Sequence, residues 1–248
     1  APPNAASTRL ALRDSVMQVD SLRVETSAAT ATAQGRLGLG PTRRDSMAVG
    51  MFVDSLGGLR AYLGSGGDAI DTIAGSVAVD AMLRGNLEAL DARVALDAGG
   101  LVRNGLSSRR LSADATLRDL TGSPALDVTL RADTVRAGGL AFVQATGEAR
   151  TRADGVIDFA VGAEATTGPA LRASGTVRTA ADTTYLVVDR GTLVVADEAW
   201  ALGDTANVRR VGDRVAVDSI VLVGPDSARV VAGGTYADTG TLAAFARV

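Results

Sequence analysis

One short phrase recurs along this chain and constrains its fold more than any other feature. In each copy, two apolar residues in alternation precede an Asp-Ser or Asp-Thr pair, and two more apolar residues follow it. The copies lie at Met17–Val24, Leu130–Ala137 and Val215–Leu222, with a shorter one at Met51–Leu56. Self-similarity on this scale indicates stacked supersecondary units. We therefore expect a single repeat array, with repeats at about 9–63, 64–122, 123–182 and 183–248.

A glycine follows two of the copies at the same distance. Gly35 lies sixteen residues after Val19 and Gly233 lies sixteen residues after Val217, whereas Gly147 comes one residue sooner in the middle copy. Within each copy, the apolar residues that flank the Asp-Ser pair are three positions apart, so a regular strand would place them on opposite faces. Asp-Ser is a poor pair for a two-residue hairpin turn. Either a two-residue turn or a β-bulge could produce this change of face; we favour a bulge or bend of the strand at each copy, with the Asp side chain in solvent.

Alternation of apolar residues with polar or small ones runs through nearly the whole chain with a period of two. It is clear at Met47–Val53, Ile157–Val161 and Leu171–Val177, and turn clusters rich in Gly and Asp separate such segments. This pattern predicts about 15 to 18 strands in an all-β, mostly antiparallel architecture. The one helical candidate is Asp54–Leu63, where we expect a single-turn connector.

The composition restricts the chemistry that this chain can perform. The 248 residues include no Cys, no His and no Lys, so all 25 basic residues are Arg. A thiolate nucleophile, an imidazole base, a Ser-His-Asp triad, a Schiff base and a P-loop are therefore excluded, and we expect no enzymatic activity. The net charge is −3, without a basic stripe or aromatic platforms, which disfavours nucleic acid as a partner. No apolar run approaches the roughly 18 residues of a membrane-spanning helix.

Neither a metal site nor a cofactor is expected. Gly64–Asp71 has the glycine and carboxylate content of a calcium-binding β-roll turn, but it occurs once and lacks the repeat period. The few Glu residues are scattered, which disfavours paired carboxylates for glycoside hydrolysis. Trp200 is the only tryptophan, and we interpret it as an anchor for a turn of the sheet rather than as a partner contact.

The order of segments in the C-terminal part of the chain resembles the repeat pattern of a known family. A strand, a Trp-containing strand, a short polar link, a strand with an acidic bend and a strand ending in glycine follow one another. The first two strands lie within Thr192–Leu202, the polar link is Asn207–Val211, and the last two strands are Val215–Leu222 and Ala228–Thr235. The other half of this repeat pattern is Val19–Leu39 followed by Met47–Leu63. The pattern is similar to the repeats of the bacterial AsmA-like/TamB family. The resemblance covers nearly the whole chain, most clearly residues 9–63 and 184–248.

This resemblance implies a fold and a function. Proteins of the family are anchored in the inner membrane by an N-terminal helix, extend through the periplasm and form a long, taco-shaped β-groove with an apolar lining. They are implicated in moving phospholipid to the outer membrane, and TamB also in outer-membrane protein assembly with a β-barrel partner. We therefore expect an elongated, curved, mostly antiparallel repeat sheet that forms an open hydrophobic groove. Its expected partners are phospholipid acyl chains and an outer-membrane β-barrel assembly protein.

The same resemblance implies a place in the cell. The chain has no membrane anchor, so we expect it to be an interior or C-terminal segment of a longer protein that is anchored to the inner membrane. The segment itself would lie in the periplasm of the bacterial cell envelope.

The apolar positions of the alternating strands are the candidate lining of the groove. They are Met47, Val49, Met51, Val77, Val79, Val128, Leu130, Phe159, Val161, Leu193, Val195, Val215 and Val217. Their alternation partners, including Asp158, Arg172, Arg214 and Asp218, are expected to face water. Two alternatives stay open: these residues pack against a second sheet of the same chain, or the chain is a surface-exposed β-solenoid of the adhesin type.

Overall fold

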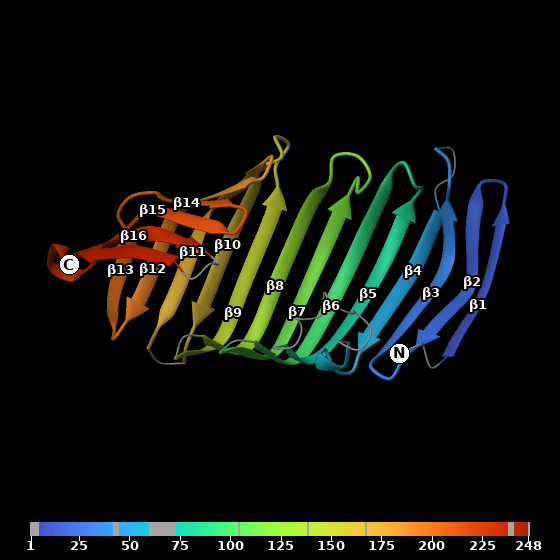
Figure 1. Cartoon of the computed structure of the whole chain (residues 1–248), viewed down its shortest axis with the longest axis horizontal. Coiled ribbons are helices and arrows are strands. Elements are labelled where there is room, and N and C mark those ends of the chain that lie inside the picture. The colour runs from blue at the N-terminus through green and yellow to red at the C-terminus, as the bar shows by residue number, and fades with distance from the viewer. Residues whose placement is uncertain are drawn as a thin grey trace. The chain divides into compact units, whose positions relative to one another are not determined.

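The computed structural model describes residues 5–41, 45–59, 73–103, 105–137, 139–166, 168–237 and 241–247. Within them the chain forms 17 β-strands and two short 3₁₀ turns (Figure 1). The pairings between these strands are antiparallel, so the predicted all-β, antiparallel architecture is confirmed. The chain is divided into two compact units, Ala1–Ala141 and Phe142–Val248.

The first unit is a meander in which each strand pairs with the next along the chain. Its strands are β1 (Ala5–Arg13), β2 (Val16–Glu25), β3 (Ala29–Gly38), β4 (Asp45–Val53), β5 (Ala74–Gly85), β6 (Leu90–Arg103), β7 (Leu106–Arg118) and β8 (Ala125–Ala137). Asp14 and Ser15 join β1 to β2 with φ values of 47° and 58°, as a tight two-residue hairpin requires. Because side chains alternate along each strand, the sheet has one apolar and one polar face.

The second unit is also antiparallel, and one position in its sheet is divided between two strands. Its strands are β9 (Leu140–Thr151, which begins in the first unit), β10 (Ile157–Glu164), β11 (Ala170–Ala180), β12 (Thr183–Val195), β13 (Glu198–Leu202), β14 (Ala206–Val211), β15 (Arg214–Val223), β16 (Arg229–Ala237) and β17 (Thr241–Arg247). Both β13 and β14 pair with β12 on one side and with β15 on the other. The chain between them, 203–205, therefore interrupts the hydrogen-bond ladder in the middle of the sheet.

The first Asp-Ser phrase is a β-bulge, as predicted. The register between β2 and β3 shifts between Val19 and Leu22, so Asp20 and Ser21 together oppose one residue, Gln34. Val19 and Leu22 consequently lie on the same face although they are three positions apart. The bulge therefore bends the strand and preserves its apolar face.

The third copy of the phrase has the same shift, directly after Val217 in β15. Gly35 and Gly234 pair with the residues that precede the two bulges, and their φ values are 131° and 156°. The structural counterpart of Gly35 is thus Gly234, one residue later than the Gly233 indicated by sequence spacing. At Gly35 a Cβ atom would also collide with the carbonyl oxygen of Ser46, which explains why glycine is required there.

The remaining two copies differ from the first and the third. In the middle copy, the pairing of β8 with β7 continues without a shift, and Thr134 takes a left-handed φ of 53° instead. In the short copy, β4 ends at Val53, so the phrase terminates a strand. A 3₁₀ turn follows at Gly57–Leu59, within the expected connector. Residues 60–63 of that connector and the whole of 64–71 lie outside the described residues.

The packed core of the first unit lies at one end of its apolar face. Val19, Leu37 and Met47 are buried together there. Partly buried apolar side chains surround them, namely Met17, Leu22, Ala33, Val49, Leu83 and Leu90. A curved sheet can bury side chains in this way without a second layer, because neighbouring strands bring their side chains together on the inner side.

The turns at one edge of the first unit are joined by hydrogen bonds. The bonds between turns are Leu39 N–H to Ser15 O (2.7 Å), Leu87 N–H to Gly38 O (3.1 Å) and Thr121 Oγ1–H to Glu88 O (2.7 Å). Asn86, only 2% exposed, holds the central turn, since its Oδ1 accepts the backbone N–H groups of Glu88 and Ala89, both at 2.9 Å. This edge is therefore a continuous series of linked turns.

Candidate functional site

Apolar side chains of the first unit lie in rows that cross the sheet. Directly opposed residues of an antiparallel pair project from the same face. Two such rows, here called the middle rows, run from β2 to β8. One is Val24, Ala31, Met51, Val79, Leu96, Ala113 and Leu130, and the other is Leu22, Ala33, Val49, Ala81, Val94, Ala115 and Val128. Neither row contains a polar side chain, and at about 4.8 Å per strand each is roughly 30 Å long.

All seven candidate lining residues of the first unit share this face. Met51, Val79 and Leu130 belong to one middle row, and Val49 and Val128 belong to the other. The remaining two, Met47 and Val77, lie in the flanking rows, where they pair with Leu83 and Val53 respectively. The register thus unites these side chains on one surface, and what they bind stays a prediction.

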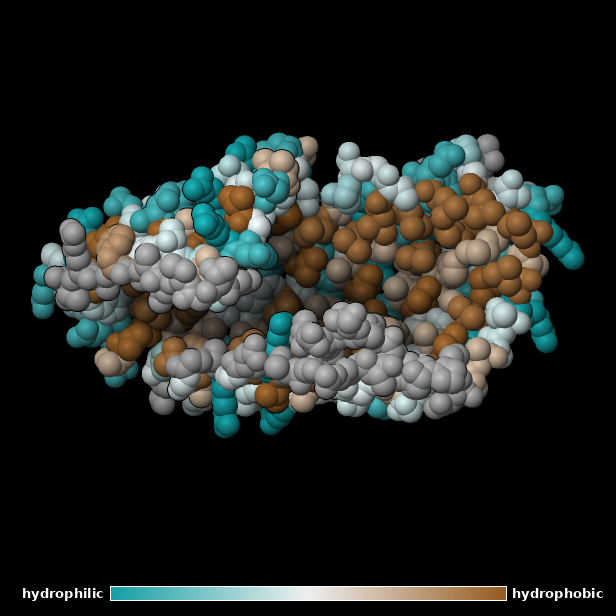
Figure 2. All heavy atoms as spheres, in the orientation of Figure 1, coloured by the Kyte–Doolittle hydropathy of each residue, from teal (hydrophilic) through white to brown (hydrophobic). Residues whose placement is uncertain are grey.

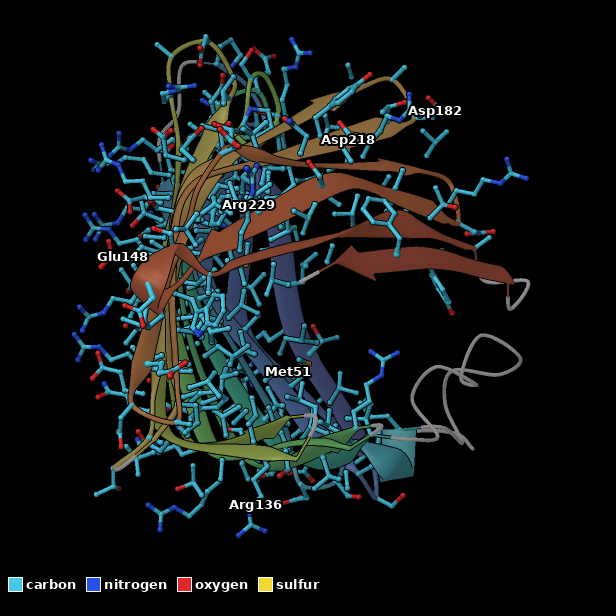
Figure 3. All side chains as sticks on the ribbon, turned by 90° about the vertical axis from the view of Figure 1, so that its left-hand side faces the viewer. Met51, Arg136, Glu148, Asp182, Asp218 and Arg229 are labelled. Carbon is cyan, nitrogen blue, oxygen red and sulfur yellow. The ribbon has the colours of Figure 1, made fainter. Side chains whose placement is uncertain are left out.

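The apolar face is most open between its two ends. Along β4, Met47 is 6% exposed and Val53 is 1% exposed, whereas Met51 between them is 43% exposed. Apolar side chains gather on the hollowed face of β3–β7 that is turned toward the viewer in Figure 2. Met51 projects from the inner side of the curved strands in Figure 3. The first unit therefore exposes a contiguous apolar surface whose borders are well packed.

The opposite face of the first unit is mostly polar. One of its rows runs Arg23, Thr32, Gly50, Asp80, Ala95, Asp114 and Thr129. A hollow of about 960 Å³ is lined mainly by residues of this face, and six residues of the second middle row also contribute to its lining, namely Leu22, Ala33, Val49, Ala81, Val94 and Ala115. Arg110 pairs with Asp97 across two of the strands at 3.1 Å, and Phe52 and Met82 are exposed apolar exceptions.

The second unit repeats this two-faced arrangement. Its candidates Phe159, Val161, Leu193, Val195, Val215 and Val217 share one face by register. One row of that face runs Ile157, Val177, Leu186, Val208 and Val217 and crosses β10, β11, β12, β14 and β15. Val161 is 41% exposed and Val195 is 43% exposed. Leu171, opposite Leu193 on the same face, is 39% exposed, so these three positions belong to the open part of the apolar face in the second unit.

The alternation partners of these residues are exposed, as expected. Asp158 and Arg172 are both exposed and lie on the polar face, where Arg172 forms an ion pair with Glu164. Arg214 and Asp218 are exposed as well, and Asp218 belongs to the bulge of β15. Glu148 in Figure 3 lies on the outer side of its sheet. Charge is therefore largely separated from the apolar surface in this unit too, with Glu198 opposite Val195 and Arg210 opposite Val215 as exceptions.

Trp200 lies on the apolar face of the second unit, opposite Leu193. A Cβ atom at Gly224 would come within 2.8 Å of the Trp200 ring, so the indole packs directly on this glycine. The Gly224 N–H donates to the carbonyl of Ala228 at 2.8 Å and closes the turn between β15 and β16. Trp200 therefore anchors this turn, which agrees with its interpretation from the sequence.

Sequence reasoning missed the contributions of β2, β3, β6 and β7 to the middle rows. Val94 and Leu96 of β6 alternate with polar residues, and that signal could have added them. The alanines of β3 and β7, such as Ala31 and Ala113, carry no comparable signal, because alanine also occurs on the polar face of this sheet, as at Ala48 and Ala95. The sequence carried no signal for Asn86 either, since its role in linking the turns depends on segments that are distant in the sequence.

The face offers apolar contact without directional chemistry. Among the described residues, no three His, Cys, Asp or Glu side chains form a group that could hold a metal ion. No described helix is both long and apolar enough to span a membrane. Comparisons with family models, curated proteins and solved structures give no match. The function is therefore inferred from the arrangement of the two sheet faces.

Proposed function

We propose that this chain is a lipid-conducting segment of the AsmA-like/TamB type, in which the apolar faces bind phospholipid acyl chains. The observation that carries the proposal is the pair of middle rows, which cross seven strands without one polar side chain. Monomeric proteins rarely expose apolar patches larger than a few hundred Å² unless the patch has a binding role. An extended apolar track suits an extended apolar ligand.

The energetics support an acyl chain as that ligand. Each CH₂ group that leaves water contributes about 0.8 kcal/mol, so even a partly covered chain is held firmly. The middle rows provide no hydrogen bond or charge that would fix the chain at one position. An acyl chain can therefore pass from one strand to the next with little change in contact energy. In this proposal conduction is passive, and no enzymatic step or cofactor takes part.

The proposal includes a cellular setting. The parent protein would be anchored to the inner membrane, and this segment would lie in the periplasm and pass phospholipid toward the outer membrane. Assistance to outer-membrane protein assembly, through a β-barrel partner, is the second activity that the family resemblance suggests. A β-solenoid adhesin fits less well, because solenoid coils stack in parallel whereas these strands pair antiparallel.

The test compares neighbouring positions on opposite faces. Met51→Asp and Val161→Asp place a carboxylate at exposed positions of the apolar faces, and Phe52→Asp and Ala160→Asp place the same group on the polar faces one residue away. Phospholipid that co-purifies with each protein is quantified by mass spectrometry, and circular dichroism verifies the fold. We expect the two apolar-face variants to stay folded and to lose most of the bound lipid, while the polar-face variants retain it.

Two results would refute the proposal. One is a wild-type protein that carries no lipid and takes none up from vesicles. The other is an equal loss of lipid in the apolar-face and polar-face variants, because the lipid would then not occupy the apolar face. Unfolding of Val161→Asp would instead indicate a closed core, since a buried, unpaired carboxylate is not tolerated.

A further inference from the structure

The hairpin between β6 and β7 ends in a tip that combines aliphatic and basic side chains. Val102 is 48% exposed and Leu106 is 52% exposed. Val102 pairs with Ser107, which in turn pairs with Arg136 of β8, so the three residues form one row across the tip. Arg103, which pairs with Leu106, is also exposed. Two aliphatic side chains are thus interleaved with arginines at the end of the hairpin.

The tip carries positive charge that nearby carboxylates do not balance. Arg110 does have acidic neighbours, since it pairs with Asp97 at 3.1 Å and lies opposite Asp133. By contrast, no ion pair joins Arg103, Arg109 or Arg136 to any carboxylate in the part of the chain that the structure describes. The side chain of Arg136 points away from the inner side of the strands in Figure 3. These three arginines, here called the tip arginines, are therefore available to an external anion.

Neither feature would be informative alone. Single exposed aliphatic residues are ordinary on protein surfaces, and an isolated arginine is usually just solvated. Together they match the surface of an anionic bilayer, where aliphatic side chains enter the headgroup region and guanidinium groups bind phosphate in a bidentate manner. Arginine also keeps its charge at the interface while its stem lies along apolar surface.

We propose that the tip formed by Val102, Leu106 and the tip arginines docks on a membrane surface that contains anionic phospholipid. The tip shares no residue with the middle rows, so this docking site is separate from the lipid-conducting face. Its failure would leave the proposed function intact, and the failure of that function would leave the docking site intact.

The test measures flotation of the purified chain with vesicles of phosphatidylcholine alone or mixed with phosphatidylglycerol. We expect binding to the anionic vesicles that weakens as salt is added. Replacing the tip arginines together by Gln should lower the partition coefficient roughly a hundredfold. The matched control replaces Arg84, Arg93 and Arg131 by Gln, which removes the same charge from exposed positions elsewhere on the unit. This control should bind as the wild type does.

A second variant tests the aliphatic part of the tip. Val102→Ser together with Leu106→Ser keeps every charge, and we expect it to weaken binding to anionic vesicles several-fold. Circular dichroism verifies that each variant is folded. The proposal is overturned if the wild type ignores anionic vesicles, if it binds neutral vesicles equally well, or if the two arginine triplets have equal effects. Binding to polyglutamate without binding to vesicles would assign the tip to an acidic polypeptide instead.

Discussion

Two positions on the same face of β4 should respond very differently to the same charge. Val53 is 1% exposed and Met51, two residues earlier, is 43% exposed. At Val53 an Asp carboxylate would be buried without a partner, which costs about 3–5 kcal/mol. At Met51 the carboxylate stays hydrated, and the main loss is the apolar contact of a side chain that is only partly buried. Full burial of Met contributes about 1.5–3 kcal/mol, so we expect a loss of about 1–1.5 kcal/mol there.

The assay is urea unfolding followed by far-UV circular dichroism. Tryptophan fluorescence is unsuitable for this pair, because Trp200 lies in the second unit and both substitutions lie in the first. We expect Met51→Asp to unfold cooperatively with a modestly lower midpoint and Val53→Asp to be unfolded or nearly so without urea. Equal destabilisation of the two variants would refute the claim that the face is packed at its ends and open in the middle.

Three further predictions concern the frame that holds the faces. Gly35→Ala should lower the free energy of unfolding of the first unit by about 1–3 kcal/mol, because Gly35 has a φ of 131° that alanine rarely adopts. Gly40 has no atom near its Cβ position, so Gly40→Ala should be neutral in the same denaturation assay. Asn86→Ala should lower the free energy of unfolding by about 1–3 kcal/mol by leaving two backbone N–H groups without their acceptor, and the exposed Asn207 provides the control. Among the described strands β1 pairs only with β2, and Leu10 of β1 is 58% exposed, so the other edge of β1 is open to a second copy of the chain. In this cysteine-free chain, Leu10→Cys should therefore yield disulfide-linked dimers on oxidation. A variant that stays monomeric on a non-reducing gel would contradict an open edge.

Periodicity in the sequence was sufficient to assign strands and faces. Every candidate that alternates strictly, from Met47 in β4 to Val217 in β15, lies on the same face as its neighbours within its unit. The side-chain period of a strand is a local property of the backbone, so a single sequence reveals it. The same reasoning located the bulges at Asp20 and Asp218, because a bulge leaves a detectable break in the period.

Features that depend on pairing between distant residues could not be predicted in this way. Val217 pairs with Gly234 rather than with Gly233, because the two bulge residues that follow Val217 together oppose Gly233, and this pairing is visible only in the sheet. The middle phrase keeps its register with β7 and has a left-handed φ of 53° at Thr134, although its sequence matches the other copies. The role of Asn86 depends on three turns that meet only after the sheet has formed.

The bulge at Asp20 and Ser21 permits a sharper test of what the repeated phrase does. If Ser21 is deleted, Val19, Asp20 and Leu22 become a regular strand opposite Gly35, Gln34 and Ala33. The pairing with β1 becomes regular as well, since the register shift between Arg9 and Leu10 is no longer needed. All apolar residues of β2 keep their face, so we expect the deletion variant to fold with a straighter strand.

A deletion in a regular strand should have the opposite outcome. Removal of Gly50 from β4 would move Met51 and Val53 to the polar face, or would force the first half of the strand to slip, because one residue reverses the alternation. The loss is about 1.5–3 kcal/mol for buried Val53 and about 1–1.5 kcal/mol for Met51, and their sum of about 2.5–4.5 kcal/mol is a large part of the stability of a small domain. Urea denaturation of the two variants should therefore separate them clearly. If both deletions unfold the unit, the Asp-Ser phrase is needed for folding itself. If only the Gly50 deletion unfolds the unit, the role of the phrase is to bend a sheet whose two faces are already set by the alternation of side chains.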